Sequence, residues 1–475
     1  MPFILACFIF LTSTLSYSAS NDLPSLGDAT SGLISIEQEH ALGRAWLRNL
    51  RSQASTLHYA ELTEYTENLI YKLASHSQVK DRRFEILLLD NKQLNAFAVP
   101  GGIIGINAGL FLHAKNEAQF AAVLAHELAH LSQRHFARQI DENRKQTPIA
   151  LATLLGSIML LATNNTEAGF AGLMTSQAAA TQWSLSYSRD WEREADRLGM
   201  HTLISAKIDP HGMPDMFKQM FDAHKYSERP PEFLLTHPVT ENRISDAAGR
   251  VDALDTKPLP EDIDYHLMRT RLQIKYNKQS HNLAFYLNRL NTQLNEEQEQ
   301  ITRYGLALIL YDLKKFKQAY THSQRLLDLD KNRISYQTLN DQILFGLNHT
   351  DQALKNVKEQ LKLNPNNHPL TMTYTSMLMS LARYHDAADV LQSHVLIRKT
   401  DPYIWQQLAE AHGKAGNDVA LYQARAEFLH LTGQKEKALQ QLKTALNLSK
   451  GNFLLSARIE QRAREIEAST NDLTF

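Results

Sequence analysis

Two histidines one helical turn apart, with a glutamate directly after the first, are the residues of this sequence best placed to do chemistry. On a helix, His126 and His130 lie about 40° apart around the axis and can reach one metal ion. Glu127 projects nearby, where it can take a proton from a metal-activated water. The preceding residues 121–125 are apolar, which predicts a buried helix. Unpaired polar side chains would be costly there, and a bound metal ion removes that cost.

A catalytic zinc site needs a third protein ligand and an open fourth position for water. His135 lies nine residues after His126, about 180° away on a continuous helix, so we expect it to face elsewhere. Glu192 is the better third ligand, and Asp196 one turn later can accept the free ring N–H of a ligating histidine. Glu194 points away from Glu192 and is predicted to be solvated. The alternative is that these acids form a surface salt-bridge network with the arginines among them.

Two further candidates follow a proline-rich stretch. His237 stands between Thr236 and Pro238, where a stiff backbone could aim its ring across the cleft. A neutral histidine in the fourth position of zinc would close the site and hold it latent. The alternatives are an ordinary loop histidine or a substrate contact. Arg243 could stabilise an oxyanion, or it could form a salt bridge that only anchors its loop.

The elements expected to position these residues are helices around a small sheet. Apolar residues at helical spacing predict helices over residues 35–76, 117–143 and 183–205. Residues 84–89 are typical of a strand. Residues 96–106, broken by Pro100-Gly101-Gly102, predict a hairpin whose second arm is residues 103–106.

A repeat pattern begins after residue 262, where predicted strands disappear. Ala319, Ala353 and Ala387 are each 34 residues apart, which is the period of a tetratricopeptide repeat. The segments around these alanines also have similar patterns of residue types. A later unit over residues 428–448 is similar, but it does not keep the strict 34-residue spacing. Such repeats stack into a concave solenoid that binds proteins. The alternative is an ordinary helical bundle with coincidental alanines.

Composition bounds the remaining possibilities. The chain has 475 residues, 43% of them hydrophobic, and 50 basic against 51 acidic residues. Its net charge is therefore too small to attract nucleic acid or anionic lipid.

The apolar run over residues 3–15, followed by small residues, predicts a signal peptide; the alternative is a buried N-terminal element. Cys7 is the only cysteine and lies in this run, which excludes disulfides and cysteine-bound zinc in the mature chain. Residues 148–163 are nearly uncharged, and we slightly favour a helix that faces lipid or a partner over a core helix.

The sequence resembles the zinc peptidases typified by the CAAX prenyl protease and the HtpX membrane protease. The matching residues are His126-Glu127-x-x-His130, the Ser188 to Asp196 segment and Asn95 to Gly102, and the overall layout resembles a periplasmic branch of the family. The resemblance implies one zinc ion per chain, held by His126, His130 and Glu192, with Glu127 as general base. It also implies an edge strand that pairs with substrate backbone, at Ile103, Ile104, Gly105 and Ile106.

The resemblance further implies a role in outer-membrane protein quality control, in the periplasm of a Gram-negative bacterium. The enzyme would be soluble or peripherally membrane-associated. The implied partners, bound through the repeats, are outer-membrane β-barrel proteins and their assembly machinery, including the lipopolysaccharide-assembly barrel protein.

Together these features predict a mainly α protein. We expect a signal peptide (1–19), an α+β zinc-peptidase domain with a small β-sheet (20–262) and an all-α tetratricopeptide-repeat solenoid (263–475). The expected reaction is metal-assisted amide hydrolysis. The competing hypothesis is an assembly adaptor or chaperone that acts through the repeats and rarely cleaves. A purely structural zinc site is disfavoured, because Glu127 would then have no purpose.

Overall fold

The computed structural model describes residues 35–142, 159, 188–225, 231–254, 259, 262–276 and 283–469. The expected signal peptide and Cys7 lie outside these residues, as does the apolar segment 148–163 apart from Met159. Within the described ranges, no helix combines the length and the apolar character needed to cross a bilayer.

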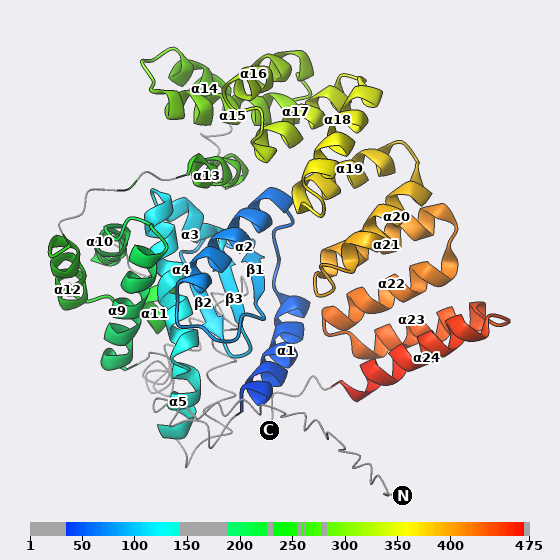
Figure 1. Ribbon diagram of the computed structural model, residues 1–475, viewed down its shortest axis with the longest axis horizontal. Coiled ribbons are helices and arrows are strands. Elements are labelled where there is room, and N and C mark those ends of the chain that lie inside the picture. Colours follow the sequence, from blue (N-terminus) through cyan, green and yellow to red (C-terminus); the bar gives the residue numbers. More distant parts are fainter. Residues whose placement is uncertain are drawn as a thin grey trace, which may run out of the picture.

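The first part of the chain is a set of helices around a small sheet (Figure 1). Its elements are α1 (Ile36–Gln53), α2 (Ala60–Ser75), β1 (Glu85–Leu89), β2 (Ala96–Val99), β3 (Ile103–Asn107), α3 (Ala108–His113), α4 (Glu117–Ser132), α5 (His135–Glu142), α9 (Arg189–Ser205), α10 (Gly212–Lys225), α11 (Phe233–Thr236) and α12 (Glu241–Asp252).

The sheet has the strand order β1-β3-β2 among the described residues. β2 and β3 form the predicted antiparallel hairpin, which Gly101 and Gly102 turn with φ values of 81° and 74°. β1 pairs with β3 in parallel, so β3 is the central strand and all five of its residues are buried. The expectation that residues 103–106 form a free edge is therefore wrong. Both sides of β3 are hydrogen-bonded, and among the described residues β1 and β2 are the outer strands of the sheet. An isolated bridge also joins Leu89 of β1 to Thr56.

Helix α4 runs through the centre of this domain. Asn116 caps it by accepting a hydrogen bond from the backbone N–H of Gln119, and every residue from Glu117 to His130 is buried. Helix α9 lies against it at very short range, because Gly199 has no side chain: a Cβ there would lie 3.1 Å from the backbone nitrogen of His126. This close approach brings the acidic residues of α9 to the histidines of α4.

The second part of the chain is helical throughout its described residues. Its elements are α13 (Ile263–Tyr276), α14 (Leu283–Leu290), α15 (Glu296–Asp312), α16 (Phe316–Leu329), α17 (Ile334–Gly346), α18 (Thr350–Leu363), α19 (His368–Ser380), α20 (Tyr384–Val395), α21 (Pro402–Ala415), α22 (Asp418–Leu431), α23 (Lys435–Leu448) and α24 (Phe453–Ala468).

The repeat period predicted from the alanines is present in these helices. Ala319, Ala353 and Ala387 each lie in the second helix of a pair, in α16, α18 and α20, and each is fully buried. The turn inside each pair has a residue with positive φ at the same spacing: Lys314, Asn348, Ala382 and Gly416. The predicted fold class, an α+β domain followed by an all-α repeat array, is confirmed.

The repeats do not stand apart from the first domain but form an arc along one side of it (Figure 1). The buried residues of α13, α15 and α17 belong to the same hydrophobic core as those of α2, α3 and α4. In α13, the fully buried Tyr265 donates hydrogen bonds to the carbonyl oxygens of Phe111 and Ala114. The repeat helices therefore pack on the first domain along this seam as well as on one another.

One face of α2 is held by the repeats through three glutamates. The guanidinium of Arg271 lies 3.1 Å from Glu61, and that of Arg398 donates to Glu67 at 2.8 Å. Between them, the Asn367 amide donates to Glu64 at 2.7 Å. Burial, together with the neighbouring carboxylates, raises the pKa of Glu64 to about 7. Polar contacts thus join the two parts along the length of α2.

Candidate metal centre and active site

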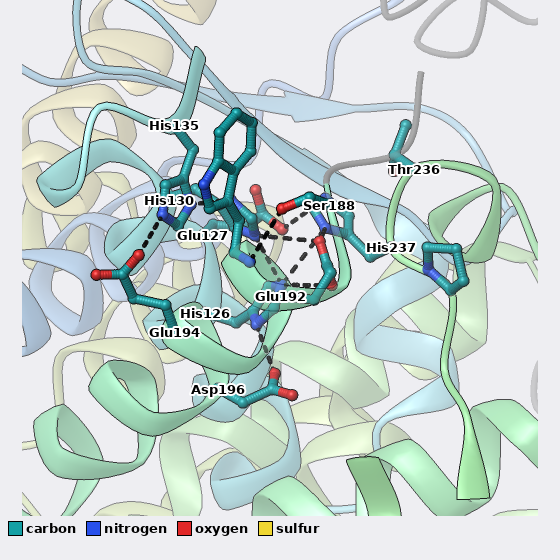
Figure 2. Close-up of polar contacts among 12 residues, drawn as sticks. His126, Glu127, His130, His135, Ser188, Glu192, Glu194, Asp196, Thr236 and His237 are labelled. Atoms are coloured by element: carbon teal, nitrogen blue, oxygen red, sulfur yellow. Dashed lines mark hydrogen bonds and ion pairs between the residues drawn. The ribbon is translucent and has the colours of Figure 1, made fainter. Parts of the chain in front are cut away.

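Four buried side chains converge at the centre of the first domain. His126 and His130 come from α4, Glu192 from the first turn of α9, and His237 from the residue that ends α11. One ligand atom from each lies within 4.8 Å of the others. Figure 2 shows their polar atoms pointing toward a common centre. The structure thus brings together all four metal ligands predicted from the sequence.

The spacing of these atoms fits a tetrahedral ion. Two ligands of one zinc ion lie about 3.3 Å apart, given metal–nitrogen bonds of about 2.0–2.1 Å. Nε2 of His126 lies 3.0 Å from Nε2 of His130 and 3.4 Å from Nδ1 of His237. Carboxylate oxygens of Glu192 lie 3.5 Å from both His126 and His130 and 2.9 Å from His237.

The charge state of the donor set also fits a metal. Burial, and then the ring of His126, lower the pKa of His130 well below its ordinary value, so the neutral imidazole is favoured. Burial alone would raise the pKa of Glu192, but His237 and Arg243 hold it below its ordinary value. Three imidazoles and one carboxylate, packed this closely and buried, form a donor set that suits a zinc-type ion.

Residues outside the cluster of four lie against the ring of His126. The carboxylate of Asp196 lies 2.9 Å from Nδ1 of His126, next to the ring that it was predicted to orient (Figure 2). Arg243 holds this carboxylate with two hydrogen bonds of 2.8 Å, from Nε and from one terminal nitrogen. Although burial raises it, Arg243 and His126 lower the pKa of Asp196 to about 2, so Asp196 stays ionised.

His135 and Glu194 are the residues whose role sequence reasoning missed. Nδ1 of His135 lies 2.8 Å from Nδ1 of His130, and Nε2 of His135 lies 3.2 Å from the Glu194 carboxylate. Glu194 is half-buried and paired with Arg138, so the expectation that it is solvated is wrong. His135 was expected to face elsewhere because a continuous helix was assumed. Arg134 instead has φ 50°, which ends α4 and lets α5 begin at His135 in a new direction.

Glu127 lies beside the centre without joining the four ligands. It is 1% exposed, and burial raises its pKa to about 8. Its Oε1 lies 3.4 Å from Nε2 of His237. Helix α4, which carries Glu127, packs against β2. In the part of the chain that the structure describes, β2 is an outer strand of the sheet.

Comparison with known proteins agrees with this geometry. The model of peptidase family M48 matches residues 60–251, which include the four converging residues and Glu127. The beta-barrel assembly-enhancing protease of Escherichia coli K12 is 31% identical, with 94% of this chain and 92% of that protein covered. The protein of the same name in Yersinia pestis gives the same identity and coverage. The chain belongs to the family of beta-barrel assembly-enhancing proteases. A mitochondrial metalloendopeptidase of Schizosaccharomyces pombe is 28% identical over 39% of this chain and 52% of its own length.

Membership of the beta-barrel assembly-enhancing protease family confirms the resemblance drawn from the sequence motifs. It makes the chain a metallopeptidase of family M48, and the buried histidine and glutamate cluster is a group of residues that could hold its metal ion. The two relatives match nearly the whole chain, so the likeness extends through the repeats as well as the peptidase domain.

The guanidinium of Arg243 is already paired with oxygen atoms of the protein. Besides its two bonds to Asp196, one terminal nitrogen lies 2.7 Å from Glu192 and donates to the carbonyl oxygen of Pro238 at 2.8 Å. Its guanidinium also lies over the ring of Phe217, 4.8 Å from the centroid. These contacts favour the anchoring interpretation of Arg243 over the oxyanion interpretation, because its donors already point at protein oxygens.

Arg243→Ala is expected to lower the free energy of unfolding by about 3–5 kcal/mol, because it leaves two buried carboxylates without their cation. Chemical denaturation of the metal-free chain measures this change. Arg250→Ala is the matched control, since Arg250 is exposed on the same helix and its loss should have almost no effect. An Arg243→Ala chain of unchanged stability but slowed turnover would support the oxyanion role instead.

Proposed function

We propose that the protein is a periplasmic zinc metalloendopeptidase that degrades misassembled outer-membrane β-barrel proteins. The observation that carries the proposal is the closed cluster of His126, His130, Glu192 and His237 with Glu127 beside it. The relatives are named for enhancing β-barrel assembly, which supports this choice of client. The repeat array, packed directly on the peptidase domain, is the part that would bind such clients.

The residues divide the work of amide hydrolysis among them. When bound, a zinc ion supplies a Lewis acid that lowers the pKa of a water ligand toward about 7. Glu127 accepts the proton of the attacking water and returns it to the leaving amine. Its burial raises its pKa toward neutrality, which suits a group that must both accept and donate a proton near neutral pH. His126, His130 and Glu192 hold the ion.

We assign substrate pairing to β2 instead of β3. β3 has partners on both sides, whereas β2 is an outer strand of the described sheet and lies next to α4. Because α4 carries Glu127, this packing supports a substrate position near the general base. An extended substrate that added a strand to β2 would place its backbone alongside Glu127.

His237 acts as a latch in this proposal. Its Nδ1 faces the donor cluster, 2.9 Å from Glu192, so it takes the fourth position that water would need. Its Nε2 lies 3.4 Å from Glu127, so the same ring also covers the general base. The ring is held by stacking on Phe233, with centroids 4.7 Å apart. Withdrawal of His237 would therefore free the fourth position and Glu127 together.

His237→Ala is expected to raise background proteolysis, including cleavage of the enzyme itself, by roughly tenfold if the latch is worth about 1.4 kcal/mol. Casein cleavage and autolysis of the zinc-loaded chain measure this effect. His201→Ala is the control, because His201 is exposed on α9 and away from the cluster. A drop in activity would instead make His237 a substrate contact.

Loss of a single ligand tests the metal centre itself. Each of His126→Ala, His130→Ala and Glu192→Ala is expected to lose zinc and degradation of an unfolded protein together, since each removes one of three obligatory donors. Metal analysis of the purified chains decides the point. Full zinc occupancy in Glu192→Ala would give the third-ligand role to another residue.

Client holding without cleavage is a second candidate function, and one observation favours it. A cavity of about 1110 Å³ opens between α2, β1 and the repeats. It lies at the β1 edge of the sheet, and β2 is at the opposite edge. It is large enough to hold several residues of an extended chain, and it is lined by both polar and apolar side chains. We propose that β-barrel clients and their assembly machinery, including the lipopolysaccharide-assembly barrel protein, bind the repeats here. The test is cross-linking from residues that line this cavity to bound client proteins, in cells that produce the Glu127→Gln variant.

A further inference from the structure

Nδ1 of His130, the ring nitrogen that faces away from the donor cluster, has an unusual partner. A metal-ligating histidine generally donates its second ring N–H to a carboxylate, a carbonyl or water, which sets the tautomer of the ring. His126 fits this pattern, because its Nδ1 lies 2.9 Å from the carboxylate of Asp196. In contrast, Nδ1 of His130 faces Nδ1 of another imidazole, that of His135, at 2.8 Å.

The positions of the ring protons of His130 and His135 follow from the partner that His135 has at its other ring nitrogen. Nε2 of His135 faces the carboxylate of Glu194 at 3.2 Å, and an ionised carboxylate only accepts (Figure 2). A neutral His135 ring has one N–H, which it donates from Nε2, and its Nδ1 is then an acceptor. His130 must in turn donate from Nδ1, and its Nε2 is left as the lone pair that faces the cluster.

We propose that His135 is a positioning residue for the metal ligand His130, acting as a relay between that ligand and Glu194. The inference rests on the proposed function only in that the cluster binds zinc. Each histidine of α4 is then oriented by a carboxylate of α9: Asp196 directly for His126, and Glu194 through the His135 imidazole for His130.

The surroundings of His135 hold the relay in place. Its side chain is completely buried, and the Trp191 indole stacks on its ring with centroids 5.4 Å apart and planes 9° apart. Arg138 pairs with Glu194 at 2.9 Å and keeps that carboxylate in reach. Trp191 and Glu194 both belong to α9, so the helix that supplies Glu192 as a ligand also fixes His130.

Two substitutions at the same position separate a relay from a merely structural contact. In His135→Asn the side-chain oxygen takes about the place of Nδ1, so the acceptor for His130 remains while the bond to Glu194 is lost. In His135→Gln the terminal amide takes about the place of Nε2, so the bond to Glu194 remains while the acceptor for His130 is lost. A second-layer partner of a metal ligand is worth about 10- to 100-fold in metal affinity.

The measurement is Zn²⁺ affinity of the full chain, determined by competition with a chromophoric chelator, with the melting temperature of the metal-free chain recorded beside it. We expect His135→Asn to stay within a few-fold of the wild-type affinity and His135→Gln to lose about 10- to 100-fold. The reverse order, with Gln retaining and Asn losing zinc, would overturn the relay and make His135 a tie between α5 and α9.

A third variant covers the case in which a change at buried His135 prevents folding. Glu194→Ala alters a partly exposed side chain and removes the acceptor that sets the His135 tautomer, while both histidines remain in the chain. We expect a several-fold loss of zinc affinity from it, and an unchanged affinity would overturn the relay. A wild-type chain that bound no Zn²⁺ would overturn the proposed function as well, so the two failures give different results.

Discussion

Glu127→Gln is expected to reduce proteolysis by about 100- to 10,000-fold while the chain keeps its zinc and its fold. Glutamine has nearly the same shape as glutamate, but its amide cannot accept the proton of the attacking water. Glu127 is not one of the four converging ligands, so its neutralisation removes no metal donor. It also removes a buried carboxylate whose pKa burial has raised to about 8, so no loss of stability is expected.

The measurement is degradation of an unfolded protein by the zinc-loaded chain, with zinc content and melting temperature recorded for the same preparation. Glu117→Gln is a matched control, because Glu117 is also buried, begins the same helix α4 and accepts a hydrogen bond from Tyr65 that a glutamine oxygen can still accept. Near wild-type turnover in Glu127→Gln would rule out Glu127 as the general base.

Truncation of the chain after residue 262 is expected to unfold the peptidase domain. The cut removes α13, whose Tyr265, Leu267 and Leu272 are fully buried in the core shared with α2, α3 and α4. Each large apolar side chain contributes about 1.5–3 kcal/mol by burial. Loss of all the shared residues of α13, α15 and α17 exceeds the roughly 5–15 kcal/mol that keeps a domain folded.

A longer fragment that ends at Leu363 is the matched control. It keeps α13 to α18, and with them the repeat residues of the shared core and the contacts of Arg271 and Thr338 with Glu61. We expect this fragment to unfold cooperatively and to bind zinc, whereas the fragment ending at 262 should give no cooperative transition by circular dichroism. A stable, zinc-binding fragment ending at 262 would show that the shared core is dispensable.

The residues that could be predicted from the sequence alone are those whose relation is local. His126 and His130 share a face because the helical period sets their angle, and Glu127 follows from the same motif. Glu192 and Asp196 share a face of α9 for the same reason. The 34-residue repeat and the hairpin that ends in β3 likewise depend on neighbours in the chain, so period and turn residues were enough.

Expectations failed where one residue or one distant partner decided the outcome. The left-handed turn at Arg134 redirected His135 toward His130, although helical geometry predicted the opposite side. The hairpin was foreseen, but only the parallel pairing with β1 decided that β3 is central and β2 is the edge. The partners of the three glutamates of α2 lie more than 200 residues away in the chain, so no local pattern could identify them.

The sequence by itself thus determined which residue types could hold a metal and activate a water, because helix period and motif spacing are properties of adjacent residues. Only the tertiary structure decided that His237 closes the cluster, that Arg243 is held by Asp196 and Glu192, and that the repeats complete the peptidase core. The physical reason is the range of the forces involved. Backbone hydrogen bonds and side-chain periodicity act within a few residues, whereas burial of apolar surface and pairing of buried charges are satisfied by whatever part of the chain the fold brings near.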